Sequence, residues 1–256
     1  MILTICAIAF ASLLLVFMLS FQFGSYETMI NTSVKIQTGH LQIQAQKFQE
    51  KKNIRLVVPE PAKIAEILNT IPHIAAYTYR GQAFSLISSD QRTYGVAVTG
   101  IDPDREAGVS RLKSLVREGN FLTAEDSGQA LVGKLLAQNL RVKLGDELTV
   151  LGQGRDGSIA ATVVQVKGIF SSGIGDFDRA AIHIPLKTFQ EVYSMQGAVH
   201  EVVVIADSLR SIDAIKLGVE AGLSSQESKI ALQVLDWDEL MPGLRQSIEM
   251  DLISGL

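Results

Sequence analysis

Residues 1–23 constrain the fold of this chain more than any other stretch. They contain no Asp, Glu, Lys or Arg, and their polar side chains are limited to Thr4, Ser12, Ser20 and Gln22. At a rise of about 1.5 Å per residue, a helix of about 20 residues crosses the hydrocarbon core of a bilayer, which is about 30 Å thick. Backbone polar groups in lipid must bond to one another, so the segment is predicted to be a membrane-spanning helix.

Two other interpretations of residues 1–23 fit less well. A secretory signal peptide begins with basic residues and has a shorter apolar run, whereas no Lys or Arg precedes this one. A core helix of a soluble protein is rarely apolar on all sides over such a length. The missing basic flank leaves the orientation in the membrane open, because the positive-inside rule has nothing to act on.

Helical patterns flank the rest of the chain. The first continues over residues 24–34, so the membrane helix is expected to extend beyond the bilayer as a stalk of two or three turns. A second pattern covers residues 237–256, with Asp236 as its predicted N-cap. Because this second helix is still apolar where the sequence stops, we expect it to be cut. The residues that carry the second pattern are Leu240, Leu244, Ile248 and Leu252.

Composition indicates a folded domain between these helices. The 256 residues are 47% hydrophobic and 6% aromatic, which suits a packed core of aliphatic side chains. Net charge is −4 with the two signs interspersed, and no basic block appears that would favour nucleic-acid binding. The single cysteine, Cys6, lies in the apolar helix, which excludes disulfides and thiolate metal sites in the rest of the chain.

Residues 35–105 are predicted to be rich in strands. Apolar and polar residues alternate over 40–47, with Leu41, Ile43 and Ala45 on one face. Polar turns separate the later segments, and a single helix interrupts the run, which favours an α+β sheet with helices on one side. The predicted strands lie at 40–47, 56–58, 74–79, 83–88 and 94–101, and the helix at 62–69.

The remaining segments up to residue 236 alternate between short strands and helices. Residues 118–122 are predicted to form a turn, and residues 176–178 an irregular loop. The predicted strands lie at 130–132, 147–151, 159–170, 180–184, 200–206 and 230–235, and the helices at 110–117, 135–140, 186–193 and 211–221.

A near match to a phosphate-binding loop occupies residues 128–134. Gly128, Gly133 and Lys134 fit the pattern G-x-x-x-x-G-K, but Leu135 stands where Ser or Thr would hold Mg²⁺. Residues 130–132 are apolar and are predicted to be a strand inside the supposed loop. Nucleotide binding at this segment is therefore not expected.

The other chemically suggestive patterns also fail on their context. Residues 152–157 read G-x-G-x-x-G, but a β-branched strand follows instead of the helix that a dinucleotide site requires, so a hairpin turn is predicted. Asp176 and Asp178 supply too few oxygens for Ca²⁺ by themselves. The four histidines, His40, His73, His183 and His200, are isolated in sequence. We therefore predict no catalytic, cofactor-binding or metal-ligating residues.

The order of short motifs along the chain resembles a transporter family. The motifs follow the apolar helix and its continuation, and their spacing is more specific than any one of them. They are Thr38-Gly39-His40-Leu41-Gln42-Ile43, Gly100-Ile101-Asp102-Pro103, Glu118-Gly119-Asn120-Phe121-Leu122, the segment 131–146, Val166-Lys167-Gly168-Ile169-Phe170, and Trp237 with its helix. Together they resemble the permease subunit of ABC transporters of the MacB/LolC/LolE type, close to the FtsX-like permeases.

That resemblance implies an architecture. Such permeases have four membrane helices, with a large two-lobed extracytoplasmic domain between the first and the second. It implies a membrane helix and stalk at 1–34, a discontinuous α/β lobe from 35–105 and 200–236, and an inserted smaller β-rich lobe at 106–199. Residues 237–256 would then be a return stalk beside residues 1–23, leading toward a second membrane helix that this sequence lacks.

The resemblance also implies function and partners. It implies a non-catalytic permease in the inner (plasma) membrane that dimerises, contacts lipid and couples a separate cytoplasmic ATPase to export or extraction by mechanotransmission. A periplasmic partner protein is a further expectation. The short hairpin near residues 152–158 favours a general exporter over a lipoprotein-releasing permease. The alternatives are a membrane-anchored nucleotide-binding or hydrolytic enzyme using residues 128–134, and an anchored adaptor without an ATPase.

Overall fold

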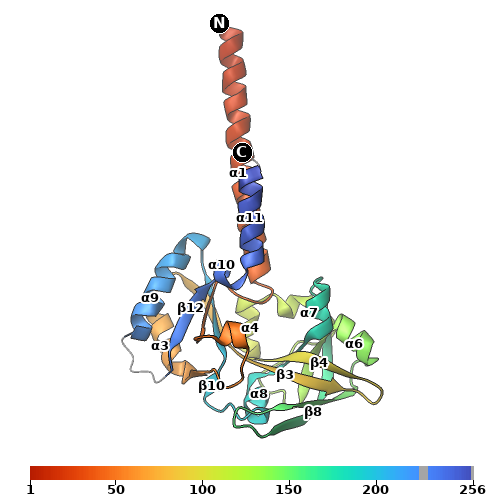
Figure 1. The fold of residues 1–256 in the computed structure, drawn as a ribbon. Helices are drawn as coiled ribbons and strands as arrows, with labels where there is room; N and C mark the ends of the chain where they lie inside the picture. The colour runs from red at the N-terminus through yellow and green to blue at the C-terminus, as the bar shows by residue number, and fades with distance from the viewer. Residues whose placement is uncertain (225–229, 255–256) are drawn as a thin grey trace.

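A long helix projects from a folded domain in the computed structural model, which describes residues 1–224 and 230–254. Helix α1 (Ile2–Val34) projects from the domain as a long rod, and α11 (Pro242–Ser254) runs back along its lower part (Figure 1). Nearly all side chains of α1 are exposed apart from Ile30 and Val34 at its base. Among the described residues, α1 is the one helix long and apolar enough to cross a membrane.

The domain is built on one ten-stranded sheet. At one end three strands pair antiparallel in the order β12 (Leu232–Asp236), β1 (Leu41–Ala45) and β11 (Glu201–Ala206), and β11 pairs in turn with β3 (Ile74–Ser88). Strand β1 therefore lies between two strands from the end of the sequence. This pairing brings the start and the end of the domain together.

Six strands of the sheet, β3 among them, close into a barrel. Their order is β3, β4 (Thr93–Ile101), β9 (Ala181–Pro185), β6 (Gln129–Gly133), β8 (Ile159–Phe170) and β7 (Glu147–Gln153). Closure occurs because β7 bonds to β8 on one side and to β3 on the other, where Leu86 faces Leu151. Strand β5 (Val116–Gly119) extends the sheet beyond β8, and β2 (Val58–Pro59) and β10 (Ala198–Val199) form a separate pair.

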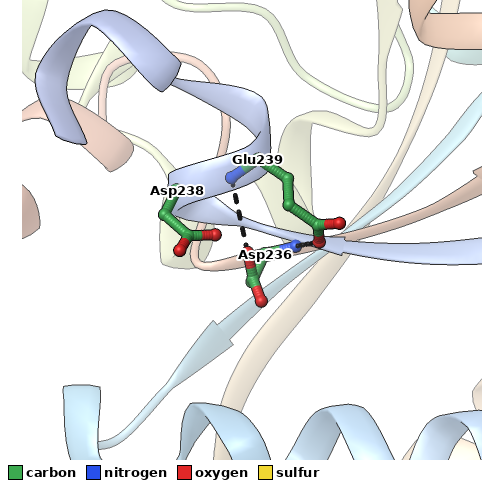
Figure 2. A group of neighbouring side chains, drawn as sticks. All are labelled: Asp236, Asp238 and Glu239. Atoms are coloured by element: carbon green, nitrogen blue, oxygen red, sulfur yellow. Dashed lines mark hydrogen bonds between the residues drawn. The ribbon is translucent and has the colours of Figure 1, made fainter. Parts of the chain in front are cut away.

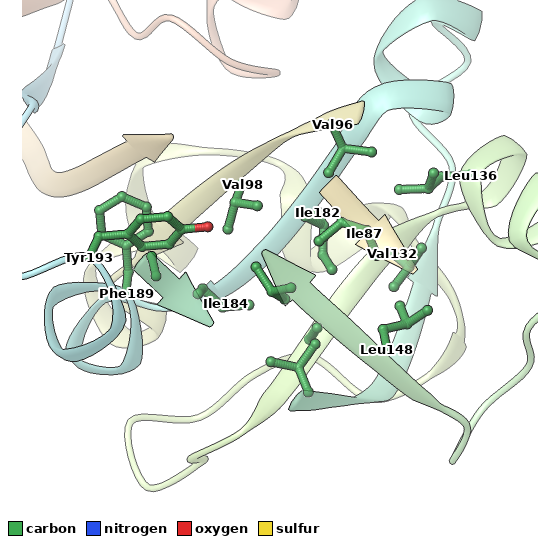
Figure 3. Close-up of a cluster of buried hydrophobic side chains, with 14 of the residues drawn as sticks. Ile87, Val96, Val98, Val132, Leu136, Leu148, Ile182, Ile184, Phe189 and Tyr193 are labelled. Atoms are coloured by element: carbon green, nitrogen blue, oxygen red, sulfur yellow. The ribbon is translucent and has the colours of Figure 1, made fainter. Parts of the chain in front are cut away.

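Two main hydrophobic clusters fill this framework. The first occupies the barrel, where side chains of β3, β4, β6, β7 and β9 converge with Leu136 and Phe189 from helices at the barrel ends (Figure 3). The second lies between the strands β12, β1 and β11 and two helices, α3 (Pro61–Thr70) and α9 (Ile212–Ser224). Full burial of each aliphatic or aromatic side chain stabilises the fold by about 1.5–3 kcal/mol.

Shorter helices complete the domain. Helix α4 (Pro103–Val109) covers the opposite face of β3 and β11, where Val109 packs against Val203 and Ile205. The remaining helices are α2 (Phe48–Lys51), α5 (Leu112–Leu115), α6 (Lys134–Leu140), α7 (Gly175–Ala180), α8 (Leu186–Val192), the 3₁₀ turn η1 (Leu209–Ser211) and α10 (Trp237–Leu240).

The mixed α/β class with an N-terminal apolar helix agrees with the prediction, but one predicted turn is wrong. Residues 74–79 and 83–88 are not two strands, because β3 runs without a break through Arg80, Gly81 and Gln82. A polar stretch with a glycine resembles a turn in sequence. Here Arg80 is buried against Glu106, and Gly81 leaves the space that the Phe189 ring fills.

Four further predictions need correction. Residues 110–117 are helical only over Leu112–Leu115, and the predicted turn at 118–122 begins as strand β5, which pairs with β8. Residues 176–178 belong to helix α7 instead of an irregular loop. Residues 237–254 form two helices, since the backbone leaves the helical region at Met241 before Pro242 starts α11. Positions 255 and 256 of the predicted return helix lie outside the described residues.

Candidate functional site

The two projecting helices enter the sheet at one place, which we call the stalk joint. It comprises the connector 35–40 between α1 and β1, residues 236–241 between β12 and α11, and Arg80 beneath them. Leu41 is the first residue of β1 and Asp236 the last of β12, and the two face each other in the antiparallel pair. Each stalk helix therefore continues into one of two adjacent, directly bonded strands.

The connector after α1 is held by backbone bonds and by a close approach. Gly39 N–H donates to Val34 O at 2.8 Å, and Arg111 N–H donates to Lys35 O at 2.8 Å. Gly39 has φ of +71°, a conformation that side chains with a Cβ rarely adopt, and a Cβ there would overlap Val203 Cγ1. A glycine is therefore required at the bend that turns the stalk into the sheet.

His40 ties the base of α1 to β11. Its Nε2 lies 3.0 Å from Asn31 Oδ1 on α1, and its Nδ1 accepts the Ala206 N–H at 3.0 Å. Because Nδ1 is the acceptor, the neutral ring carries its proton on Nε2 and donates to Asn31. Burial, with the nearby Lys35 charge, lowers the pKa of His40 to about 4. The ring is therefore neutral near pH 7 and keeps both contacts.

Arg80 on β3 holds the connector in place through hydrogen bonds. Its guanidinium donates to Gln37 O, and makes two bonds to the Glu106 carboxylate, from Nε at 3.1 Å and Nη2 at 2.6 Å. Both side chains are buried. Burial alone would raise the pKa of Glu106, but the charge and hydrogen bonds of Arg80 outweigh it and hold that pKa below its ordinary range. This buried pair joins the connector, β3 and α4.

The second stalk begins with a capping box. Asp236 Oδ1 accepts the Glu239 N–H, and Glu239 Oε2 accepts the Asp236 N–H (Figure 2). Lys216 on α9 then donates to both carboxylates, at 2.8 Å to Asp236 and 2.6 Å to Glu239. The start of α10 is thus fastened to the body of the domain, since it is tied to β12 and to α9.

The carboxylates of Asp236, Asp238 and Glu239 lie close enough together to resemble a cation site. The ammonium of Lys216 already bonds two of them, so the positive charge that this cluster attracts comes from the protein itself. Hydrogen bonding and repulsion from Asp236, together with partial burial, raise the pKa of Asp238 to about 6. Arg245 on α11 lies 3.3 Å from Asp238 and links the cluster to the outgoing stalk.

The stalk helices also contact each other. Tyr26 on α1 donates its hydroxyl to the Asp251 carboxylate on α11, and Gln22 donates to Tyr26 at 2.7 Å. Nearer the sheet, Thr38 Oγ1 lies 3.4 Å from Met241 Sδ. The two helices consequently leave the same end of the domain side by side, as Figure 1 shows.

The motifs that suggested enzyme chemistry have structural roles. Residues 130–132 pair with β8 and β9, and Lys134 is an exposed residue at the start of α6. Residues 154–158 form the turn of the β7–β8 hairpin. The Asp178 carboxylate on α7 accepts bonds from Ser171 Oγ, Ser172 N and Ser172 Oγ, which stabilise the loop before the helix. No nucleotide site is assembled from these residues.

Of the residues at the joint, the sequence predicted Asp236 as a helix cap and placed Gly39, His40 and Trp237 in family motifs, but it predicted none of their long-range contacts. Arg80 and Glu106 are 26 positions apart, and His40 reaches across 166 positions to Ala206. The strand-like stretches on both sides of residues 80–82 are the one signal that could have singled out Arg80, because an arginine inside a continuous central strand must find a buried partner.

A match over most of the chain decides the family. The family model described as the MacB-like periplasmic core domain matches residues 1–221. The chain belongs to this family. MacB-like core domains are parts of ABC-type transporter permeases, which are non-catalytic components that work with an ATPase. The protein is accordingly an inner-membrane permease component with an extracytoplasmic domain, as the resemblance implied.

Solved structures of MacB-like domains share this fold. The extracellular domain of the noncanonic ABC-type transporter YknZ from Gram-positive bacteria aligns with TM-score 0.56 and 15% identity, over 77% of this chain and 99% of that one. The periplasmic region of MacB from Actinobacillus actinomycetemcomitans aligns with TM-score 0.56 and 14% identity, over 86% and 98%. No match was found among curated proteins.

Proposed function

We propose that this permease component couples ATP hydrolysis by a separate cytoplasmic ATPase to export or extraction of a substrate by mechanotransmission. In this proposal α1 and α11 carry displacement between the membrane and the domain, and no substrate passes through a channel in the domain. The proposal includes a second permease copy, as homo- or heterodimer, and lipid around α1. It also includes the two-lobed division at 35–105 with 200–236 and at 106–199, and a further membrane helix after the return stalk.

The observation that carries the proposal is the pairing of Leu41 with Asp236. Backbone bonds between two strands resist sliding, because any slip of one residue would break the ladder and turn every side chain to the other face. A displacement of either stalk therefore moves β1 and β12 together. The buried Arg80–Glu106 pair and the Lys216 contacts supply the links through which that movement reaches the rest of the domain.

A flexible insertion in the connector tests this coupling. Four residues, Gly-Ser-Gly-Ser, are inserted between Thr38 and Gly39 of the full-length permease, which is reconstituted with its ATPase in nanodiscs. The lobe is followed by energy transfer from a donor on Leu217→Cys, in a Cys6→Ser background, to acceptor lipids. We expect ATP to change the transfer in the parent protein, and the insertion to reduce that change while ATP hydrolysis continues, because only the α11 stalk then remains rigidly joined to the sheet.

The matched control places the same insertion between Asp90 and Gln91, in the exposed turn between β3 and β4. This variant is expected to respond to ATP as the parent does, because its insertion lies outside the joint. A connector variant that keeps the full ATP response would contradict mechanotransmission through the stalk joint. A parent protein with no ATP response would contradict the proposed function as a whole.

A further inference from the structure

The outer wall of the barrel carries apolar side chains where solvent contact favours polar ones. Phe84 and Ile159 are 76% and 80% exposed, and three further aliphatic side chains beside them are also exposed. We call the set the wall patch; it consists of Phe84, Leu86, Leu151, Ile159 and Val163. Among the residues that the structure describes, they are most of the large hydrophobic side chains exposed outside the stalk helices.

Strand register shows that the wall patch is one surface. Leu86 of β3 faces Leu151 of β7, and Ile159 and Val163 of β8 share the face of Leu151 because they oppose Gln153 and Thr149. Phe84 extends the patch toward β4, because its ring lies over Gly95 of that strand. A Cβ built on Gly95 would come within 2.7 Å of Phe84 Cζ. The alternate residues of the same strands, such as Ile87 and Val150, are buried inside the barrel.

This surface departs from the usual pattern of a half-exposed antiparallel sheet, which is apolar inside and polar outside. On the same face of β3, helix α4 covers the earlier residues, and Arg80 is paired there with Glu106. Beyond Gln82 the described part of the chain places no helix over the face. A contiguous exposed apolar patch of this kind marks a contact site for another molecule.

Its size argues against a stable pair of identical copies. The patch is three strands wide at about 4.8 Å per strand, and about six residues long at about 3.3 Å per residue, which gives an area of about 300 Å². A stable protein interface buries about 800 Å² on each partner. The wall patch therefore suits a short segment of a partner that binds and leaves.

Basic side chains beside the wall patch indicate the charge that a partner segment would carry. Residues 47–55 carry four basic side chains, Lys47, Lys51, Lys52 and Arg55, and one acidic side chain, Glu50. This stretch borders the patch at two places. Lys52 Nζ lies 3.4 Å from Oε1 of Gln82, two residues before Phe84 on β3. Arg55 lies beside Gly157 at the tip of the β7–β8 hairpin, where a Cβ built on the glycine would be 3.6 Å from Arg55 Nη2. Lys52 is paired with the buried Glu201, whereas Arg55 has no ion pair among the described residues.

We propose that the wall patch and its basic rim bind an extracytoplasmic protein through a short apolar segment flanked by acidic residues. The inference rests on the proposed function for its extracytoplasmic setting and adds a partner class to it. Strand β8 lies at the end of the domain opposite α1 (Figure 1), and the side chains of the wall patch are exposed, so the surface is accessible to such a protein away from the membrane-spanning helix.

Two synthetic peptides test the inference on the full chain in nanodiscs of zwitterionic lipid. Both carry the same Leu and Phe core, one flanked by Glu and the other by Lys, and binding is followed by fluorescence anisotropy against empty nanodiscs. We expect the Glu-flanked peptide to bind at least about tenfold more tightly than the Lys-flanked one, since each opposed charge contributes to complementarity. The assay needs no ATPase, so its failure is separate from failure of the coupling experiment.

Variants locate the binding. Phe84→Glu and, independently, Ile159→Glu are expected to weaken binding of the Glu-flanked peptide at least about tenfold, as loss of a central apolar contact does. Arg55→Glu should remove the preference for the Glu-flanked peptide. The matched control is Leu217→Glu, a single exposed leucine on α9 that should leave binding unchanged.

Three results would overturn the inference. These are equal affinity for both peptides, unchanged affinity in both Phe84→Glu and Ile159→Glu, and dissociation of a homodimer by those substitutions in analytical ultracentrifugation. The last would assign the wall patch to a second copy of the chain. Because all the substituted side chains are exposed, unfolding midpoints followed through Trp237, the single tryptophan, should match the parent.

Discussion

At the scale of single residues, the buried histidines differ in how well their rings are satisfied. His40 uses both nitrogens to join α1 to β11. His183 on β9 lies against Phe170 and Phe177, and neither of its nitrogens has a hydrogen-bond partner among the described residues. A buried polar group without a partner costs about 1–3 kcal/mol. The first ring therefore stabilises the joint, whereas the second destabilises the barrel wall.

Replacement of His183 by leucine should stabilise the domain. Burial lowers the pKa of His183 to about 4; the Glu106 charge raises this pKa slightly and the Arg80 charge lowers it slightly. The ring therefore stays neutral in the folded protein, whereas in the unfolded chain it titrates at about 6.5. As pH falls from 7 to 5 the unfolded state alone gains this proton, and folding stability decreases. His183→Leu should raise the unfolding free energy by about 1 kcal/mol at pH 7 and reduce the loss on acidification by about 2 kcal/mol.

Urea unfolding at pH 7 and pH 5 measures both effects through Trp237 fluorescence. His40→Leu serves as the comparison, because it leaves the Ala206 N–H and Asn31 without their partner and should lower stability at pH 7 by about 2 kcal/mol. If His183→Leu proved as destabilising as His40→Leu, the view of His183 as an unsatisfied ring would be wrong.

The buried Arg80–Glu106 ion pair is predicted to contribute strongly to the stability of the domain. Glu106→Ala leaves the Arg80 guanidinium buried without its counter-charge, which costs about 3–5 kcal/mol. Arg179→Ala removes an exposed pair with Asp176 and should cost less than about 1 kcal/mol. Equal unfolding midpoints for the two variants in urea would show that the joint does not depend on the buried pair.

At the scale of elements, the strands and helices of the domain follow their local sequence patterns, while the joint depends on distant contacts. Strand β8 and helix α6 match the predicted segments 159–170 and 135–140 because their apolar periodicity is uninterrupted. The predicted turn near residue 80 failed because Glu106, distant in sequence, lets an arginine lie inside a strand. Barrel closure by β7 was likewise not predictable, since it depends on pairing with β3 about 65 residues earlier.

Gly39 is the element-scale test of the joint. Gly39→Ala introduces a Cβ at φ +71° that overlaps Val203, so we expect it to destabilise the bend by about 2 kcal/mol or more. Gly24→Ala in α1 is the control, because no atom lies within 4 Å of the added Cβ and alanine favours a helix. Thermal unfolding should show a lower midpoint for Gly39→Ala alone; a midpoint shared by both variants would contradict the close approach.

At the scale of the whole molecule, the two stalk helices are connected through the sheet. Helix α1 continues into β1, β1 pairs with β12, and β12 leads through α10 to α11. Two neighbouring strands receive the two stalks at the same end, and the sheet that they join continues into the closed barrel. The wall patch lies on that barrel, at the end remote from α1 (Figure 1). A membrane-driven displacement of the stalks would thus reposition a partner-binding surface without a change of fold within the domain.

The distance between the stalk and the domain tests this account most directly. Spin labels on Glu27 of α1 and Leu217 of α9, in a Cys6→Ser background, are measured by double electron–electron resonance in the full-length permease assembled with its ATPase. We predict one narrow distance that changes by less than about 2 Å between nucleotide-free and ATP-trapped states, as expected of a rigid body. A broad distribution, or a nucleotide-dependent shift of about 5 Å or more, would contradict rigid coupling through the stalk joint.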